Sequence, residues 1–172
     1  MPIYALGDLE PTIAGDAFIH PDAVVIGDVT IGSESTVWPS AVLRGDSGPI
    51  TVGDRTSIQD GSVIHTTEFA PTQIGSDCVI GHLVHLEGCI IEDRSLIGSG
   101  SVVLHRAVVR TGGLVGAGAV VSGGTEVPSG AMALGIPAKM RLDAVDPQEI
   151  EMGATFYRER GHRYRRELRR ID

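Results

Sequence analysis

Aliphatic residues recur at every sixth position along most of the chain. Counted from Ile13, with small shifts at three places, the series holds nineteen residues, and each is isoleucine, leucine or valine. We call these positions rungs; they are Ile13, Ile19, Val25, Ile31, Val37, Leu43, Val52, Ile58, Ile64, Ile74, Ile80, Leu86, Ile91, Ile97, Val103, Val109, Val115, Val121 and Val127. Hydrophobic residues make up only 42% of the chain, so an unbroken series of this length is not a chance pattern.

The period of six predicts short strands joined by tight corners. A strand of two or three residues and a corner fill one period. Three such units close a triangular coil, whose inward aliphatic side chains stack on those of the next coil. Gly75, Gly81, Gly98 and Gly116 each follow a rung and give the backbone the freedom that a corner needs. The pattern predicts an all-β protein, a parallel β-helix of about six coils.

The period stops near residue 142, and the remaining 30 residues have a different pattern. Asp146-Pro147 is a typical helix start, with an N-cap residue followed by proline in the first turn. Apolar side chains within reach of one helical face are Ile150, Phe156, Tyr157 and Tyr164. We therefore expect a β-helix domain over residues 1–142 and a C-terminal α-helix over residues 143–172, packed along the β-helix.

The period also predicts which polar side chains are neighbours. Residues three rungs apart lie in adjacent coils, about 4.8 Å from each other. Arg44, His65 and Glu87 follow three stacked rungs, so we expect His65 to lie between the other two. By the same count, His82 lies beside Asp60 at a different corner of the triangle.

These two groups predict a metal site that needs more than one chain. In a trimer of parallel prisms, a corner of one subunit meets a face of the next, which would bring His82 of one chain to His65 and Glu87 of its neighbour. Three such ligands suit a catalytic metal ion with an open fourth position. We therefore expect a homotrimer. We expect His20, His105 and His162 to be structural or incidental.

Four segments of the chain resemble the gamma-class carbonic anhydrases and their bacterial relatives. They are FIHPDAVVIGDVTIGSESTVWPSAVLRGD, ITVGDRTSIQDGSVIHT, IGHLVHLEGC and GIPAK, and the resemblance extends from about Pro11 to Arg141. It implies that the β-helix is left-handed. It also implies that a hydroxide on the bound metal, Zn²⁺ or else Fe²⁺ or Co²⁺, attacks CO2 at the trimer interfaces to give bicarbonate.

The resemblance also implies roles for individual residues. It makes His65 and His82 metal ligands, and it makes Arg44 and Asp46 an ion pair between subunits that shapes the site. Gln59 would hold the metal-bound hydroxide and Asp60 would be its acidic neighbour. Glu68 stands where the archaeal enzymes have a glutamate that transfers protons, although the longer acidic loop around it is missing here.

The third ligand position departs from the family pattern. The family motif is GHxxxxHGC, whereas this chain has glutamate, Glu87, in place of the second histidine. Glu87 itself can ligate a metal, giving a His2Glu set. Alternatively His85 takes over, since it and Glu87 both point outward around Leu86, or the site is weak or lost. A carboxylate ligand lowers the net charge at the metal, so hydration near neutral pH would be slower.

Two other functions fit the same repeat. A hexapeptide-repeat acyltransferase would bind coenzyme A between subunits and use a histidine on a long external loop as general base. The insertions here are short, three residues after Leu43 and four after Ile64, which argues against this function. A catalytically silent trimeric scaffold would keep the fold alone, and the departure at Glu87 favours it. The fold does not decide among the three.

Composition indicates the cellular compartment and the kinds of partner to expect. No export signal or apolar run long enough to span a bilayer is present, and the two cysteines, Cys78 and Cys89, each precede a rung by two positions, where we expect core side chains. We therefore expect a cytoplasmic protein that does not bind membranes. Net charge is −8, but seven of the 14 basic residues lie between Arg158 and Arg170. Helical spacing and interspersed glutamates indicate a solvated or subunit-contacting helix face and no nucleic-acid partner.

Overall fold

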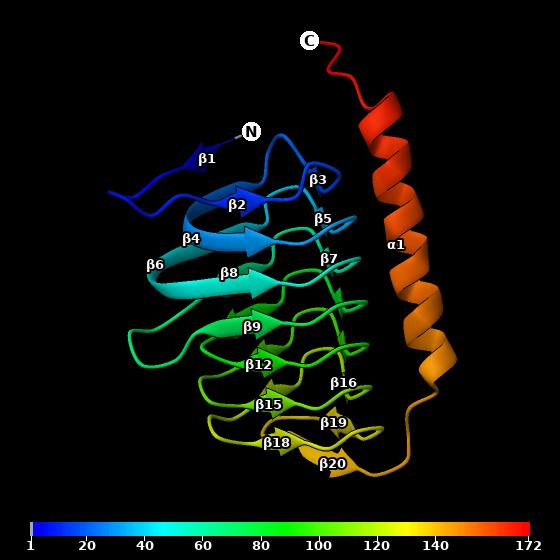
Figure 1. The fold of residues 1–172 in the computed structure, drawn as a ribbon. Coiled ribbons are helices and arrows are strands. Elements are labelled where there is room, and N and C mark those ends of the chain that lie inside the picture. The colour runs from blue at the N-terminus through cyan, green and yellow to red at the C-terminus, as the bar shows by residue number, and fades with distance from the viewer. Residues whose placement is uncertain (1) are drawn as a thin grey trace.

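The computed structural model, which describes residues 2–172, is a left-handed parallel β-helix of about seven turns with one C-terminal helix along its side (Figure 1). The triangular cross-section has three faces. Face 1 contains β1 (Ile3–Tyr4), the first half of β4 (Val24–Ile31) and of β6 (Val42–Val52), β8 (Val63–His65), β11 (His85–Glu87), β14 (Val102–Val103) and β17 (Val120–Val121). Face 2 contains β2 (Thr12–Ile13), the second halves of β4 and β6, β9 (Thr72–Ile74), β12 (Ile90–Ile91), β15 (Val108–Val109) and β18 (Glu126–Val127).

Face 3 is a separate sheet. It contains β3 (Phe18–Ile19), β5 (Thr36–Val37), β7 (Ser57–Ile58), β10 (Val79–Ile80), β13 (Leu96–Ile97), β16 (Leu114–Val115), β19 (Met132–Leu134) and the antiparallel β20 (Lys139–Arg141). We call the corner between faces 3 and 1 corner A, that between faces 1 and 2 corner B, and that between faces 2 and 3 corner C. Each of the three corners carries different polar side chains.

The rungs form the core as predicted. Eighteen of the nineteen are buried, and Ile13 at the N-terminal end is partly buried. The predicted register is confirmed, because Ile64 pairs with Leu43 on one side and Leu86 on the other. The count of about six coils was too low. Ala133, six residues after Val127, is a fully buried further rung, and β1 adds a strand at the other end. The small side chain of Ala133 hides it from a search for isoleucine, leucine and valine, and Ile3 of β1, which pairs with the rung Val25, lies outside the six-residue spacing.

Helix α1 (Pro147–Glu167) covers face 3 and runs back along the prism, so the C-terminus lies near the N-terminal end (Figure 1). The predicted start is confirmed, because the Asp146 carboxylate accepts a hydrogen bond from the backbone N–H of Gln148 at 2.9 Å. Ile150, Ala154 and Gly161 are its buried residues. A Cβ at Gly161 would lie 2.4 Å from Cγ2 of Thr36, so the helix approaches the sheet closely there.

Aromatic side chains join the helix to face 3. Tyr164 packs edge-on against Phe18 and Trp38, and Tyr157 packs edge-on against Trp38. Phe156 does not belong to this face, contrary to expectation, because its side chain is 47% exposed and stacks under Arg160. The helix also ends at Glu167, so the last five residues lie outside it. Helix α1 is not apolar enough to cross a membrane, and residues 2–172 contain no helix that is.

Candidate functional site

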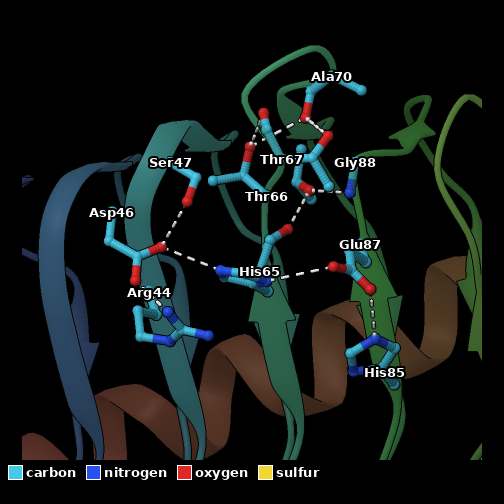
Figure 2. Close-up of polar contacts among 11 residues, drawn as sticks. Arg44, Asp46, Ser47, His65, Thr66, Thr67, Ala70, His85, Glu87 and Gly88 are labelled. Carbon is cyan, nitrogen blue, oxygen red and sulfur yellow. Dashed lines mark hydrogen bonds and ion pairs between the residues drawn. The ribbon is translucent and has the colours of Figure 1, made fainter.

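Strands β6, β8 and β11 bring the first group of candidate residues together on face 1. His65 pairs in register with Arg44 on one side and with Glu87 on the other, as predicted. The preceding residue of each strand is an inward rung, so these three side chains point outward. Figure 2 shows them in a row across the sheet.

The imidazole of His65 lies between two carboxylates. Its Nε2 is 3.0 Å from Oδ1 of Asp46, and its Nδ1 is 3.4 Å from Oε1 of Glu87 (Figure 2). Asp46 also forms an ion pair with Arg44 of the same chain. The resemblance implied that Arg44 and Asp46 pair between subunits, whereas here the two side chains pair within one chain.

His85 extends the row. Its Nε2 lies 3.3 Å from Oε2 of Glu87, so that Glu87 connects two histidines (Figure 2). The hydrogen bond with His85 is the main cause that lowers the pKa of Glu87 below its ordinary value; burial opposes the shift, and His65 adds to it. At Asp46 burial acts to raise the pKa, but the hydrogen bonds with His65 and Arg44 outweigh it and lower the pKa. Both carboxyl groups are thus held as carboxylates.

Threonines that the sequence did not single out hold the loop beyond His65. The Thr72 hydroxyl donates to the carbonyl oxygen of His65 and accepts from the backbone N–H of Gly88 at 2.8 Å. The Thr66 hydroxyl donates to the carbonyl oxygen of Ala70 at 3.0 Å. Thr72 precedes the rung Ile74 by two positions, the same place as the buried cysteines, and this position is the signal that would have identified it.

Glu68 lies at the exposed tip of this loop on corner B. Within residues 2–172 it makes no hydrogen bond or ion pair through its side chain. The neighbouring Phe69 is 62% exposed and packs against Arg106 and edge-on against His105. The chain therefore places a solvated carboxylate near the His65 row without direct contact to it.

Corner A carries the second group. The Nδ1 atom of His82 lies 2.9 Å from Oδ2 of Asp60, as the repeat period predicts, and both side chains are 48% exposed. Gln59, next to Asp60, is buried with 3% of its surface exposed. Nε2 of His82 has no hydrogen-bond partner in the described part of the chain. This nitrogen is free to bind something outside the chain.

A single chain does not bring the two groups together. Within residues 2–172, no three His, Cys, Asp or Glu side chains are placed so that they could hold one metal ion. Two of the predicted ligands do fit such an ion. Ligands at about 2.0–2.2 Å in tetrahedral geometry are separated by roughly 3.3–3.6 Å. The 3.4 Å between Nδ1 of His65 and Oε1 of Glu87 lies in this range.

The two cysteines are core residues, and His162 pairs with an acidic side chain of the β-helix. Cys78 and Cys89 are free and fully buried, as expected, and burial raises the pKa of each thiol to about 12. His162 on helix α1 lies 2.9 Å from Glu34.

Comparison with known proteins gives related chains of two descriptions. A family model described as "Bacterial transferase hexapeptide (six repeats)" matches residues 10–45 and 71–105. A carbonic anhydrase of Geobacillus kaustophilus is 43% identical over 165 residues, which are 95% of this chain and 91% of that protein. Gamma carbonic anhydrase 1, mitochondrial, of Arabidopsis thaliana is 43% identical over 103 residues, covering 56% of this chain and 38% of that one.

One similar solved structure is described as a different kind of enzyme. A Bacillus cereus protein described as a proposed acetyltransferase superposes with a TM-score of 0.94 and 38% identity, covering 96% of this chain and 98% of that one. The two descriptions share the fold and differ in the chemistry.

Proposed function

We propose that this chain, which belongs to the gamma-class carbonic-anhydrase-like family of hexapeptide-repeat proteins, forms a homotrimer that binds a metal ion between subunits and hydrates CO2. Zinc is the metal we propose, with Fe²⁺ or Co²⁺ as alternatives. The 3.4 Å separation of the His65 and Glu87 donor atoms carries the proposal. The surrounding contacts support it in three ways.

The outer surface of face 1 supports the trimer. On face 1 between β4 and β17, the outward positions directly before the rungs form one column, which lies beside the column of Arg44, His65 and Glu87. This column holds one histidine and five valines, namely Val24, Val42, Val63, His85, Val102 and Val120. The corresponding column of face 2 is more polar, and its residues are Thr12, Thr30, Thr51, Gln73, Ile90, Val108 and Glu126. Helix α1 covers face 3. The valine column of face 1 is thus an apolar strip that helix α1 leaves uncovered, which is typical of a subunit contact.

The hydrogen bonds of the two histidines support the ligand set. Asp60 engages Nδ1 of His82 and leaves the exposed Nε2 free to reach a neighbouring subunit. Asp46 engages Nε2 of His65 and leaves Nδ1 facing Glu87. Metal-bound histidines usually donate the other ring N–H to a carboxylate, a backbone carbonyl or a water, which fixes the ring and raises its basicity. We propose His65 and Glu87 of one chain and His82 of its neighbour as the ligands, with His85 as the alternative to Glu87.

The remaining candidate residues would position the reacting groups and transfer protons. A metal ion bound here would lower the pKa of a coordinated water and so supply a nucleophile near neutral pH. Arg44 neutralises Asp46, so that Asp46 holds His65 without adding net charge. Gln59 would place the nucleophile, and Asp60, which lies beside His82, would help to move protons. The exposed Glu68 carboxylate would pass protons to solvent.

The metal content of chelator-free protein, measured by mass spectrometry, tests the proposal. We expect about one metal ion per chain in the native protein and none in His65→Ala or His82→Ala. Co-refolded mixtures of these two variants separate a shared site from a site within one chain. Random assembly restores about a quarter of the interfaces if the ligands come from two chains, and restores none if they come from one. Absence of metal from the native protein would refute the proposal.

An acyltransferase is the second candidate, because the Bacillus cereus structure with that description matches nearly the whole chain. Binding of coenzyme A, measured by calorimetry, together with no metal would favour it over hydration of CO2. Absence of both would leave the silent trimeric scaffold.

A further inference from the structure

Corner C carries a ladder of side chains that face helix α1. One residue per turn has a left-handed backbone with φ between 53° and 71°, and the backbone N–H groups of four of them bond to the preceding turn. In chain order the ladder is Glu34, Arg55, Asp77, Arg94, Gly112 and Gly130. The first four have alternating charge, and the last two have no side chain.

Within the described residues, the first three charged side chains of the ladder form ion pairs, and the fourth, Arg94, does not. Glu34 lies 2.9 Å from Nε2 of His162 on helix α1. Arg55 holds Asp77 through two hydrogen bonds of 2.7 and 2.8 Å. The next residue, Arg94, is followed in the ladder by Gly112, which offers no carboxylate. Arg94 therefore has no partner on its own corner.

A cavity of about 590 Å³ opens where the glycines stand. Helix α1 forms its other wall, with the small Ala154 and the half-buried Arg158. Within residues 2–172, neither Arg94 nor Arg158 has an acidic oxygen within 4.0 Å. Both lie close enough to Asp77 to add to the lowering of its pKa, which the Arg55 hydrogen bond dominates and burial opposes.

The geometry points to a binding site for a small phosphate-bearing molecule in this cavity, with the phosphate group between Arg94 and Arg158. Guanidinium groups form paired, charge-assisted hydrogen bonds with phosphate oxygens. The volume is that of a metabolite site. Asp77 does not compete, because Arg55 already holds it, and Glu151 is the one other acid on the wall. The site is separate from the proposed metal centre, which uses corner A and face 1.

Calorimetry with glucose 6-phosphate and with inorganic phosphate, at ionic strength fixed by chloride, tests this inference. We expect the sugar phosphate to bind, and Arg94→Ala and Arg158→Ala each to weaken binding by at least about 10-fold. Glu151→Gln should tighten it. Arg166→Ala is the matched control, because Arg166 lies on the same helix outside the cavity, and it should leave affinity unchanged.

Other outcomes overturn the inference. Failure of the sugar phosphate to bind would overturn it, as would an equal loss of affinity in all three arginine variants. Weak binding of inorganic phosphate that chloride abolishes would also overturn it, because the site would then hold an adventitious ion only. Binding to phosphatidic acid vesicles without binding of the sugar phosphate would assign the surface to a membrane instead. Arg94 and Arg158 form no ion pair with any of residues 2–172, so their variants should keep the native circular dichroism spectrum and metal content. This separates the test from that of the metal site.

Discussion

Oε1 of Glu87 lies 3.4 Å from Nδ1 of His65, although 22 residues separate them in the sequence. The two residues are direct partners on adjacent strands, so the distance follows from the length of one coil. Glu87 is the position at which the chain departs from the family motif. Substitutions at Glu87 therefore give the most direct test of the proposed metal ligands.

Glu87→Gln should weaken metal binding, because an amide is a poor ligand for zinc, whereas Glu87→His should retain it. We expect at least about a 10-fold loss for the glutamine variant. Competition with a chromogenic chelator measures the affinities. His85→Ala is the informative companion, since a larger loss there than in Glu87→Gln would make His85 the ligand. The histidine variant should also hydrate CO2 at lower pH, because it removes a negative charge from the site.

Acid should destabilise the protein partly through Asp46 and Glu87. Both have pKa values below their ordinary values of 3.8 and 4.5, so the unfolded chain binds more protons than the folded one below about pH 5. Their contribution to stability is complete above that pH and is lost as the pH falls through the folded-state pKa values. Urea unfolding between pH 2.5 and 6 checks this. Asp46→Asn/Glu87→Gln should show a shallower decline, and an equal slope would contradict the assignment.

Ile64 should be a sensitive core position. Its side chain is fully buried between Leu43 and Leu86, directly before His65 in β8. Ile64→Ala should lower the free energy of unfolding by about 2–5 kcal/mol, and Ile64→Val by about 0.5–1.5 kcal/mol. Chemical denaturation measures both. Val63 lies on the outer surface of the same strand. In the monomeric protein, Val63→Ala should therefore lower the free energy of unfolding by less than Ile64→Ala does.

Gly45 should not tolerate a side chain. A Cβ at this position would lie 2.3 Å from the carbonyl oxygen of Asp28, a contact with backbone that cannot move away easily. Gly45→Ala should therefore destabilise the protein by about 1–3 kcal/mol and displace the adjacent Asp46 from His65. Gly15→Ala is the control, because a Cβ there meets nothing within 4 Å. Similar melting temperatures for the two variants would disprove the steric argument.

The repeat made most of the fold predictable. A period of six fixes which residues point inward and which residue of the next coil each one meets, so the pairing of His65 with Arg44 and Glu87, and of His82 with Asp60, followed from counting. The count failed at the two ends of the coil: at Ala133 the small side chain hid the period, and Ile3 lies outside the six-residue spacing.

Contacts that involve the insertions or the helix did not follow from the period. The approach of Asp46 to His65 depends on the path of residues 44–50, and the loop beyond His65 depends on the hydroxyl bonds of Thr66 and Thr72. The placement of Arg94 and Arg158 on the walls of one cavity depends on how α1 packs on face 3, which close contacts such as Gly161 against Thr36 decide. The sequence by itself determined the coil and its columns, because these repeat locally. Only the tertiary structure decided what meets across corners and along the helix, because no period relates those segments.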